Sequence, residues 1–351
     1  MVDLIIPVYN NRAGLVRSLM SVGTEVEGLF VTVVDDGSNV TYDDIIEAFA
    51  HIFPIQFLRL EKNSGPGAAR QLGLQHTHEK YLAFLDCGDT YTAPCFLQHQ
   101  VKIAEDLPNV IVFSWAHNEL FPDGASDYVS PTHNRIHGKL YRREVIDKYN
   151  FDFNPACTRI NEDVAFNFMI RVLADYLDTI EPIEHSYTND EAAVNWSATG
   201  PSIVRANDCE FYYHQQNYGF ALNAAYALQK LLAAGVPHEF LFKTVADGLA
   251  FVYTNYLSTT GRRPEFADDV LKGAALYYKK VFLEYPDIDL NIVKDAFYNG
   301  LSDCLANLND PIRDRMQIID FAGFLNQCDE LARDPELDNF TLNCIPQEYT
   351  T

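Results

Sequence analysis

Five short segments in the first half of the chain place carboxylates, glycines or an arginine next to an apolar stretch. They are residues 5–10, 35–38, 63–70, 85–89 and 161–163. Carboxylates can bind divalent cations and accept protons from hydroxyl groups, and a glycine-rich turn that opens a helix can bind phosphate. Segments 35–38 and 85–89 follow runs of Val, Phe and Leu. Strands that end in this way indicate a site for a nucleotide diphosphate at the edge of a parallel sheet.

Alternating strands and helices are predicted up to about residue 115. Apolar stretches at 4–8, 30–34, 55–60, 81–85 and 110–115 have the length and composition of strands. Apolar residues recur at helical spacing in the segments between them: 12–22, 42–52, 67–76 and 93–107. This order predicts an α/β domain with a mostly parallel, Rossmann-like sheet between two layers of helices.

The pattern changes after residue 115 and again after residue 205. The first change leads to an irregular part, with predicted helices at 139–149 and 162–174, a strand at 179–185 and a polar loop or linker at 188–202. After residue 205, long segments at helical spacing predict an α-helical domain, with helices at 220–234, 240–257, 267–282, 292–305 and 313–331. We therefore predict two domains, residues 1–205 and residues 206–351.

The overall composition narrows the classes of protein. The 351 residues are 48% hydrophobic, which excludes an intrinsically disordered chain. No apolar run approaches the roughly 20 residues that span a bilayer. The seven cysteines form no C-x-x-C pair, so neither a zinc site nor a disulfide framework is indicated. We expect a cytoplasmic protein without a transmembrane anchor, and the net charge of -23 disfavours binding to nucleic-acid backbones.

In this order, the five segments resemble those of glycosyltransferase family 2, the inverting enzymes with a GT-A fold. The resemblance covers about residues 2–205 and leaves out the helical domain. It implies a nucleotide-sugar donor, with a UDP-sugar favoured, a divalent metal ion, Mn²⁺ or Mg²⁺, and inversion at the anomeric carbon. It specifies neither the sugar nor the acceptor.

The resemblance also implies how the nucleotide is held. Asp36 would accept the imide N–H of a uracil or thymine, and Pro7 and Tyr9 would close over the same ring. Gly65 would let backbone amides approach the diphosphate, and Arg70 would lie near the ribose or the diphosphate. Taken alone, an Asp-Gly pair is also a common turn, and a glycine-rich segment is also an ordinary helix cap.

Segment 85–89 occupies the place of the family's D-x-D metal motif. By resemblance, Asp89 would bind the metal ion, whose charge would neutralise the departing diphosphate, and Asp86 would contact the ribose. The middle carboxylate of the motif is replaced by Gly88. His185, at the end of the predicted strand 179–185, would be a second metal ligand. A solvated turn and a structural histidine are the alternative interpretations.

The segment Asn161-Glu162-Asp163 opens a predicted helix. By resemblance, Asp163 would be the base that deprotonates the acceptor hydroxyl, and Glu162 would support it or contact the acceptor. Carboxylates at a helix N-terminus are also stabilised by the helix dipole, without any catalytic role.

Four further residues are candidates to line the sugar or acceptor side: Trp115, Asn118, His137 and Lys139. Core packing for Trp115 and surface exposure for the other three are the simpler interpretations.

Three functions remain open from the sequence. The favoured one is metal-dependent transfer of a sugar to a hydroxyl group of a glycan, a lipid-linked or another small acceptor. The second is transfer to a hydroxylated nucleobase in DNA, for which the basic residues between 135 and 143 would contact the backbone. The third is a catalytically inactive nucleotide- or sugar-binding protein, in which Gly88 marks a lost metal site. The helical domain would bind the acceptor or form a homo-oligomer.

Overall fold

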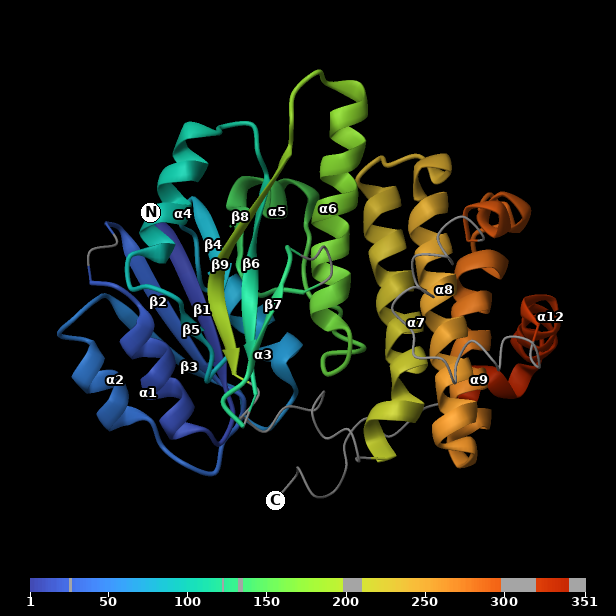
Figure 1. Cartoon of the computed structure of the whole chain (residues 1–351), viewed down its shortest axis with the longest axis horizontal. Helices are drawn as coiled ribbons and strands as arrows, with labels where there is room; N and C mark the ends of the chain where they lie inside the picture. The colour runs from blue at the N-terminus through green and yellow to red at the C-terminus, as the bar shows by residue number, and fades with distance from the viewer. Residues whose placement is uncertain (25–26, 122, 132–134, 198–209, 298–319, 341–351) are drawn as a thin grey trace. The chain divides into compact units, whose positions relative to one another are not determined.

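The computed structural model describes residues 1–24, 27–121, 123–131, 135–197, 210–297 and 320–340. The chain forms two compact units, Met1–Arg205 and Ala206–Thr351. The described part of the first unit combines strands and helices, and the described part of the second is helical (Figure 1).

The described strands of the first unit form one mixed sheet. They are β1 (Val2–Val8), β2 (Leu29–Asp35), β3 (Ile55–Arg59), β4 (Tyr81–Phe84), β5 (Thr90–Tyr91), β6 (Val112–Leu120), β7 (Ser126–Val129), β8 (Lys139–Arg142) and β9 (Ser186–Ser197). Their order is β3-β2-β1-β4-β8-β6-β9-β5, with β7 paired to β6. The first four are parallel, β8 is antiparallel to both of its neighbours, and β9 is parallel to β6. The predicted α/β class is confirmed.

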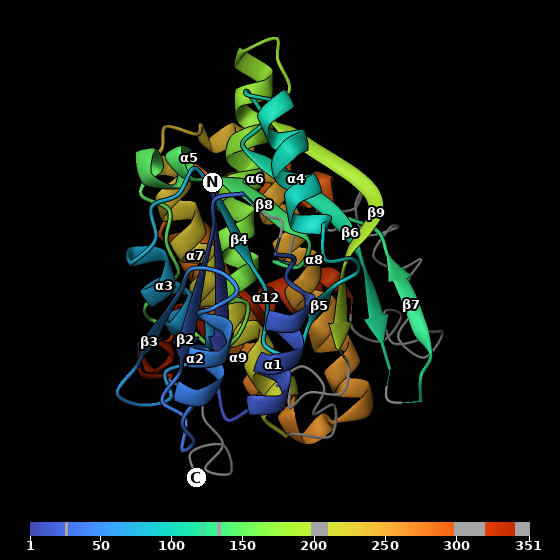
Figure 2. The same ribbon diagram turned by 90° about the vertical axis from the view of Figure 1, so that its left-hand side faces the viewer.

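Helices cover both faces of this sheet, because side chains along a strand alternate between the faces. On β1, Leu4 and Ile6 share a core with Leu15 of α1 (Arg12–Ser21). Ile5 faces the other way, toward α3 (Pro66–Gln75), where a Cβ on Gly73 would lie 2.7 Å from Ile5 Cγ2. Helices α2 (Asp43–Phe49) and α4 (Phe96–Asp106) add apolar residues to the first core. Figures 1 and 2 show α1 and α3 on opposite sides of the parallel strands.

Helix α6 (Glu162–Ile180) packs on the same face as α3. Its Phe166 meets the rings of Phe84 on β4 and Tyr141 on β8, with centroids 5.8 and 5.5 Å away. Phe153, in the loop before α6, stacks on Phe166 at 4.5 Å. This aromatic cluster fixes the N-terminal half of α6 against the sheet.

Two stretches differ from the predicted secondary structure. Residues 139–149, predicted as one helix, form β8 and then helix α5 (Arg143–Tyr149). Helix α6 continues through 179–180 of the predicted strand 179–185, and β9 occupies the whole described part, 188–197, of the predicted loop 188–202. Pairing explains both differences, because β8 lies between β4 and β6, and β9 lies between β6 and β5. Long-range hydrogen bonding thus overrides the local pattern.

The second unit contains long helices, as predicted. They are α7 (Glu210–Ala233), α8 (His238–Arg262), α9 (Ala267–Tyr278) and α12 (Phe321–Ala332). The side chain of Asn217 joins three of them, since it donates to the carbonyls of Val252 and Val270 and accepts from Asn255. The predicted helices at 292–305 and 313–331 lie partly outside the described residues. None of the described helices is long and apolar enough to cross a membrane.

The packing of α6 on the sheet can be tested at Phe166, which is fully buried. We expect Phe166→Ala to lower the free energy of unfolding by about 3–5 kcal/mol, because it leaves a cavity between α6 and the sheet. Urea unfolding followed by circular dichroism measures the change. Ile180→Ala at the exposed end of the same helix is the control, and should change it by less than about 0.5 kcal/mol. Equal effects of the two substitutions would contradict this packing.

Candidate active site

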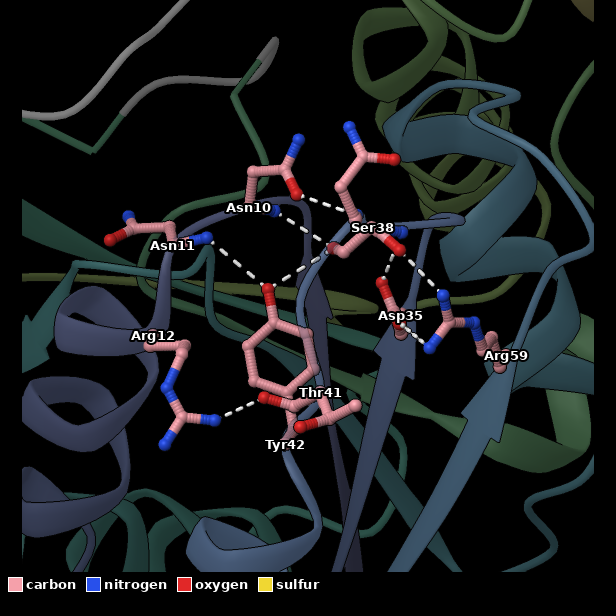
Figure 3. A network of polar contacts seen from close by, with 9 residues as sticks. Asn10, Asn11, Arg12, Asp35, Ser38, Thr41, Tyr42 and Arg59 are labelled. Atoms are coloured by element: carbon pink, nitrogen blue, oxygen red, sulfur yellow. Dashed lines mark hydrogen bonds and ion pairs between the residues drawn. The ribbon is translucent and has the colours of Figure 1, made fainter. Parts of the chain in front are cut away.

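The loop after β1 is tied to the loop after β2 (Figure 3). The backbone N–H of Asn10 donates to Ser38 Oγ at 2.8 Å, and the Asn10 side chain accepts from the Asn39 N–H at 2.8 Å. The Asn11 N–H donates to the Tyr42 hydroxyl at 3.2 Å, and that hydroxyl lies 3.1 Å from Ser38 Oγ. These hydrogen bonds hold the loop after β1, which contains Tyr9, beside the loop after β2.

The two aspartates that end β2 have different surroundings. Asp35 is fully buried, accepts from the Ser38 N–H at 2.9 Å and lies 3.3 Å from Nη1 of Arg59. It therefore stabilises the turn, as Figure 3 shows. Asp36 points the other way and accepts from the backbone N–H groups of Ser64 and Gly65, at 2.6 and 2.8 Å.

Asp36 thereby joins the loop after β2 to the start of α3. Its side chain is buried, and burial raises the pKa of Asp36 although the two N–H donors oppose the shift. Gly65 has φ +97°, and a Cβ there would lie 2.5 Å from Arg159 Cγ. A larger residue at position 65 would strain the loop that Asp36 holds.

Arg70 joins three segments that are far apart in the sequence. It is 3% exposed, and its Nη1 donates to Glu162 at 2.8 Å while its Nη2 donates to Asp86 at 2.7 Å. Burial disfavours its charge, but Asp86 and Glu162 outweigh burial and raise the pKa of Arg70. Its guanidinium thus has two carboxylate partners where the sequence predicted a ribose or diphosphate contact.

The two carboxylates that open α6 differ in exposure. Glu162 is buried beside Arg70, and burial together with Asp163 raises the pKa of Glu162 to about 7 against the opposing effect of Arg70. Asp163 is partly exposed, and no described residue forms an ion pair with its carboxylate. Of the two, Asp163 is the group that a substrate hydroxyl can reach.

Asp86, Asp89 and His137 form a cluster that can hold a divalent cation. Each offers one ligand atom, and these atoms lie within 4.8 Å of one another. One oxygen of Asp89 accepts from the Ser197 N–H at 2.9 Å; the other is buried, makes no hydrogen bond among the described residues and lies 3.3 Å from His137 Nδ1. Two carboxylates and an imidazole fit Mn²⁺, which accepts oxygen and nitrogen ligands.

The cluster attracts positive charge. Burial would lower the pKa of His137, but the carboxylates of Asp89, Asp86 and Asp163 outweigh it and raise that pKa. Burial also raises the pKa of Asp89. Next to this cluster, burial and the neighbouring cations lower the pKa of His117 to about 3, so its imidazole is neutral.

Gly88 is required by the turn that carries Asp86 and Asp89. Its φ is +107°, a backbone conformation that residues other than glycine rarely adopt. The Gly88 N–H donates to Ser18 Oγ, which in turn donates to the Asp89 carbonyl, both at 2.8 Å. The missing middle carboxylate therefore reflects the shape of the turn, and His137 offers a third possible ligand atom from elsewhere in the fold.

The structure places His185, predicted as a metal ligand, away from the Asp86–Asp89–His137 cluster. Its Nδ1 lies 2.8 Å from Asp178 and its Nε2 lies 3.3 Å from Glu181, both in or next to α6. His185 precedes the first residue of β9, whereas Ser197, which contacts Asp89, is the last. Twelve strand residues at about 3.3 Å each separate the two ends. His137 lies at the cluster instead, and its only sequence signal was its place among the candidates for the sugar or acceptor side.

Three of the four Lys and Arg residues between 135 and 143 are not available to DNA. Lys139, Arg142 and Arg143 are all buried. Arg142 donates to the carbonyls of Val110 and Leu107, and Lys139 donates to Ser114 Oγ at 3.0 Å. These cations donate hydrogen bonds to carbonyl and hydroxyl groups inside the fold, so the transfer of a sugar to DNA is not favoured.

The remaining predicted site residues differ in burial and in their contacts. Trp115 is buried and stacks on Phe113, as the packing interpretation predicted. Asn118 donates to the side chain of Asn195 on the paired strand β9 at 3.0 Å. Pro7 is buried within β1 and Tyr9 is half-buried at its end.

Residues 3–164 match the sequence model of the family described as Glycosyl transferase family 2. The domain that contains residues 3–164 belongs to glycosyltransferase family 2. It is similar to an uncharacterized glycosyltransferase of Rickettsia bellii (strain RML369-C), with 36% identity over 114 residues, which are 32% of this chain and 16% of that protein. It is also similar to the minor teichoic acid biosynthesis protein GgaA of Bacillus subtilis (strain 168), with 36% identity over 100 residues, which are 26% of this chain and 22% of that protein. The chain thus matches less than a quarter of the length of these relatives.

The family 2 domain also has solved structural neighbours. The crystal structure of S. aureus TarS in complex with UDP-GlcNAc has a TM-score of 0.51 and 17% identity, covering 85% of this chain and 92% of that one. At this identity the likeness concerns the fold alone. It confirms the predicted GT-A fold.

Arg70 provides a test of the buried ion-pair network. We expect Arg70→Lys to lower the free energy of unfolding by about 3–5 kcal/mol, because a single ammonium group cannot reach both carboxylates and leaves one buried without a partner. Arg12→Lys is the matched control, since Arg12 pairs with the exposed Asp44, and it should cost less than about 1 kcal/mol. Urea unfolding of both variants measures the difference, and equal effects would contradict the network.

Proposed function

We propose that the protein is a metal-dependent inverting glycosyltransferase that moves a sugar from a nucleoside-diphosphate sugar to an acceptor hydroxyl. The single observation that supports this most is the chain of contacts through Arg70. It links the Asp86–Asp89 turn to Glu162, next to Asp163. The start of α3, on which Arg70 lies, is in turn bound by Asp36. A nucleotide loop, a metal cluster and a candidate base thus share one framework.

The nucleotide would bind over the joined loops after β1 and β2. Each oxygen of Asp36 accepts a hydrogen bond from one backbone N–H and keeps a second lone pair. One of these lone pairs would accept the imide N–H of uracil. Pro7 and Tyr9 would lie against the base, and Gly65 would let the backbone approach the phosphates. UDP is therefore the favoured nucleotide, and it is also the nucleotide of the sugar bound in the TarS structure named above.

Asp86, Asp89 and His137 would hold the metal ion, with Mn²⁺ or Mg²⁺ as the expected cation. When bound, the cation would supply positive charge for the leaving diphosphate. Arg70 would supply little of this charge, because the carboxylates of Asp86 and Glu162 already balance it. Asp89 would be ordered before an ion binds, since Ser18, Ser197 and the turn at Gly88 fix its position.

Asp163 would take the proton from the acceptor hydroxyl as its oxygen attacks the anomeric carbon from the face opposite the diphosphate. Attack from that face inverts the configuration of this carbon. Glu162 would hold Arg70, and through Arg70 the metal turn, at a fixed distance from the base. The acceptor would be a glycan, a lipid-linked or another small molecule, and the helical unit would bind it or form a homo-oligomer.

Replacement of the base is the direct test of this function. A thermal-shift screen of nucleotide sugars with Mn²⁺ first identifies the donor. We expect Asp163→Asn to reduce sugar transfer by roughly 10²–10⁴-fold. The variant should bind this donor with the same affinity as the wild type. Asp175→Asn is the matched control on α6, because Asp175 pairs with Arg171 on the surface of the helix, and it should retain transfer. Undiminished turnover in Asp163→Asn would remove this residue from the mechanism.

The metal ligands can be tested without an assay of transfer. We expect His137→Gln to weaken Mn²⁺ binding by more than about tenfold, because a ligand is lost, as measured by calorimetry or by the spin resonance of free Mn²⁺. His185→Gln serves as the contrast, since His185 lies beside Asp178 and Glu181, and it should bind Mn²⁺ as the wild type does. The opposite ranking would return the metal role to His185.

A further inference from the structure

The carboxylate of Asp36 is connected to the segment before the proposed base through a peptide group of the glycine-rich loop. The peptide group between Asn63 and Ser64 donates its N–H to Oδ1 of Asp36 at 2.6 Å. Its carbonyl oxygen accepts a hydrogen bond from Nη2 of Arg159 at 2.7 Å. One peptide group therefore joins the guanidinium of Arg159 to the carboxylate of Asp36.

The next peptide group makes the same kind of connection. Between Ser64 and Gly65, the N–H donates to Oδ2 of Asp36 at 2.8 Å. The carbonyl oxygen of this group accepts a hydrogen bond from the hydroxyl of Thr158. Each oxygen of the carboxylate is thus joined to one side chain, Oδ1 to Arg159 and Oδ2 to Thr158. Two neighbouring side chains act on one carboxylate through two consecutive peptide groups.

These hydrogen bonds fix the direction of both N–H groups. In a trans peptide, the C=O and the N–H point to opposite sides of one plane. A side chain that is bound to the carbonyl therefore holds the N–H toward Asp36, and a rotation of the peptide plane would break both hydrogen bonds. The charge of Arg159 also polarises the peptide group, which strengthens its hydrogen bond to the carboxylate.

Residues 158–159 pack directly on the loop. A Cβ on Gly65 would lie 2.5 Å from Cγ of Arg159 and 2.7 Å from the carbonyl oxygen of Thr158, so glycine lets the two segments approach this closely. The carbonyl of Thr158 also accepts from the N–H of Gly67 at 2.9 Å. This backbone contact already holds the two segments together. The two side-chain contacts have a more specific effect, because they lie on the peptide groups that face Asp36.

The charge of Asp36 depends on the same contacts. Burial raises the pKa of Asp36; the two N–H donors and the positive charge of Arg159 oppose this shift, and the neighbouring Asp35 adds to it. An ionised carboxylate only accepts hydrogen bonds, as the imide N–H of uracil requires beside two backbone donors. Arg159 therefore favours the form of Asp36 that can bind this base.

From these contacts we propose that Thr158 and Arg159 are positioning residues for the nucleotide, which hold the carboxylate of Asp36 in the orientation that accepts the imide N–H of uracil. The inference rests on the proposed function and adds two residues that determine how tightly the base binds. Both act through Asp36. Since they lie just before the segment that carries Asp163, recognition of the donor and deprotonation of the acceptor depend on one stretch of the chain.

Uridine is the probe that tests this proposal, because it contains the base without the phosphates and needs no metal ion. Its binding to the full chain is followed by NMR near neutral pH. We expect Thr158→Val and Arg159→Gln each to weaken uridine binding by about three- to tenfold, as the loss of one hydrogen bond predicts. Arg159→Lys keeps the charge and should retain part of the affinity. Circular dichroism checks that each variant is folded.

Two matched controls lie away from Asp36. Thr179→Val removes a hydroxyl that donates to the carbonyl of Tyr176 in α6. Arg333→Gln removes an exposed ion pair with Asp329 in the helical unit. Both should bind uridine as the wild type does.

A double substitution shows whether the two residues act through the carboxylate. In an Asp36→Asn background, Thr158→Val and Arg159→Gln should weaken uridine binding no further, since the group that they position is gone. Losses that add to that of Asp36→Asn would overturn the proposal.

The pH dependence of uridine binding separates the charge from the hydrogen bonds. Affinity should fall at acid pH as Asp36 is protonated. The midpoint of this fall should move to higher pH in Arg159→Gln, because removal of the cation raises the pKa of Asp36. It should stay in place in Thr158→Val, which removes no charge, and in Arg159→Lys, which keeps the charge.

The outcomes distinguish this inference from the proposed function. If the wild type binds neither uridine nor UDP with Mn²⁺, the proposed function itself fails. If the wild type binds uridine and Asp36→Asn weakens that binding, while Thr158→Val and Arg159→Gln bind it unchanged, the proposed function stands and the positioning role is refuted.

Discussion

The buried guanidinium of Arg70 is the interaction on which the site depends. It lies between Asp86, 16 residues away in the sequence, and Glu162, 92 residues away. The desolvation of three charged groups offsets much of their attraction, so such a network adds little net stability when complete. When one partner is removed, however, a buried charge is left unpaired. The network therefore fixes positions: Asp86 is itself a proposed metal ligand, and Glu162 adjoins the proposed base Asp163.

The polar loops around this network are arranged in the same way. Asp35, Ser38 and Tyr42 hold the two loops at the nucleotide side, and Asp36 holds the start of α3. Each of these contacts uses a backbone N–H or a buried hydroxyl, so the loops keep their shape without a ligand. A site that is ordered in advance loses less entropy when substrates bind and can direct its charges at the reacting atoms.

Local patterns predicted the first four strands, the helices between them and the carboxylates at the strand ends, because these features depend on neighbours in the sequence. The pairing of β8 and β9 could not be predicted in this way. Lys139–Arg142 is a strand because β4 and β6 lie on either side of it, and the polar Ser186–Ser197 is a strand because it lies between β6 and β5. His137, and not the predicted His185, lies at the Asp86–Asp89 cluster for the same reason, since the position of each histidine depends on which strand its neighbours join. The pairing of Arg70 with two acids likewise depends on contacts across the fold.

The central claim is that Asp36, the Asp86–Asp89–His137 cluster and Asp163 belong to one site. A crystal structure of the full chain with Mn²⁺ and UDP, recorded at a wavelength where manganese scatters anomalously, tests it most directly. The account predicts an anomalous peak between Asp86, Asp89 and His137, with the diphosphate beside it, the uracil next to Asp36 and Asp163 facing the open side of the ion. A peak at His185, or a nucleotide on a surface remote from Asp36, would contradict it.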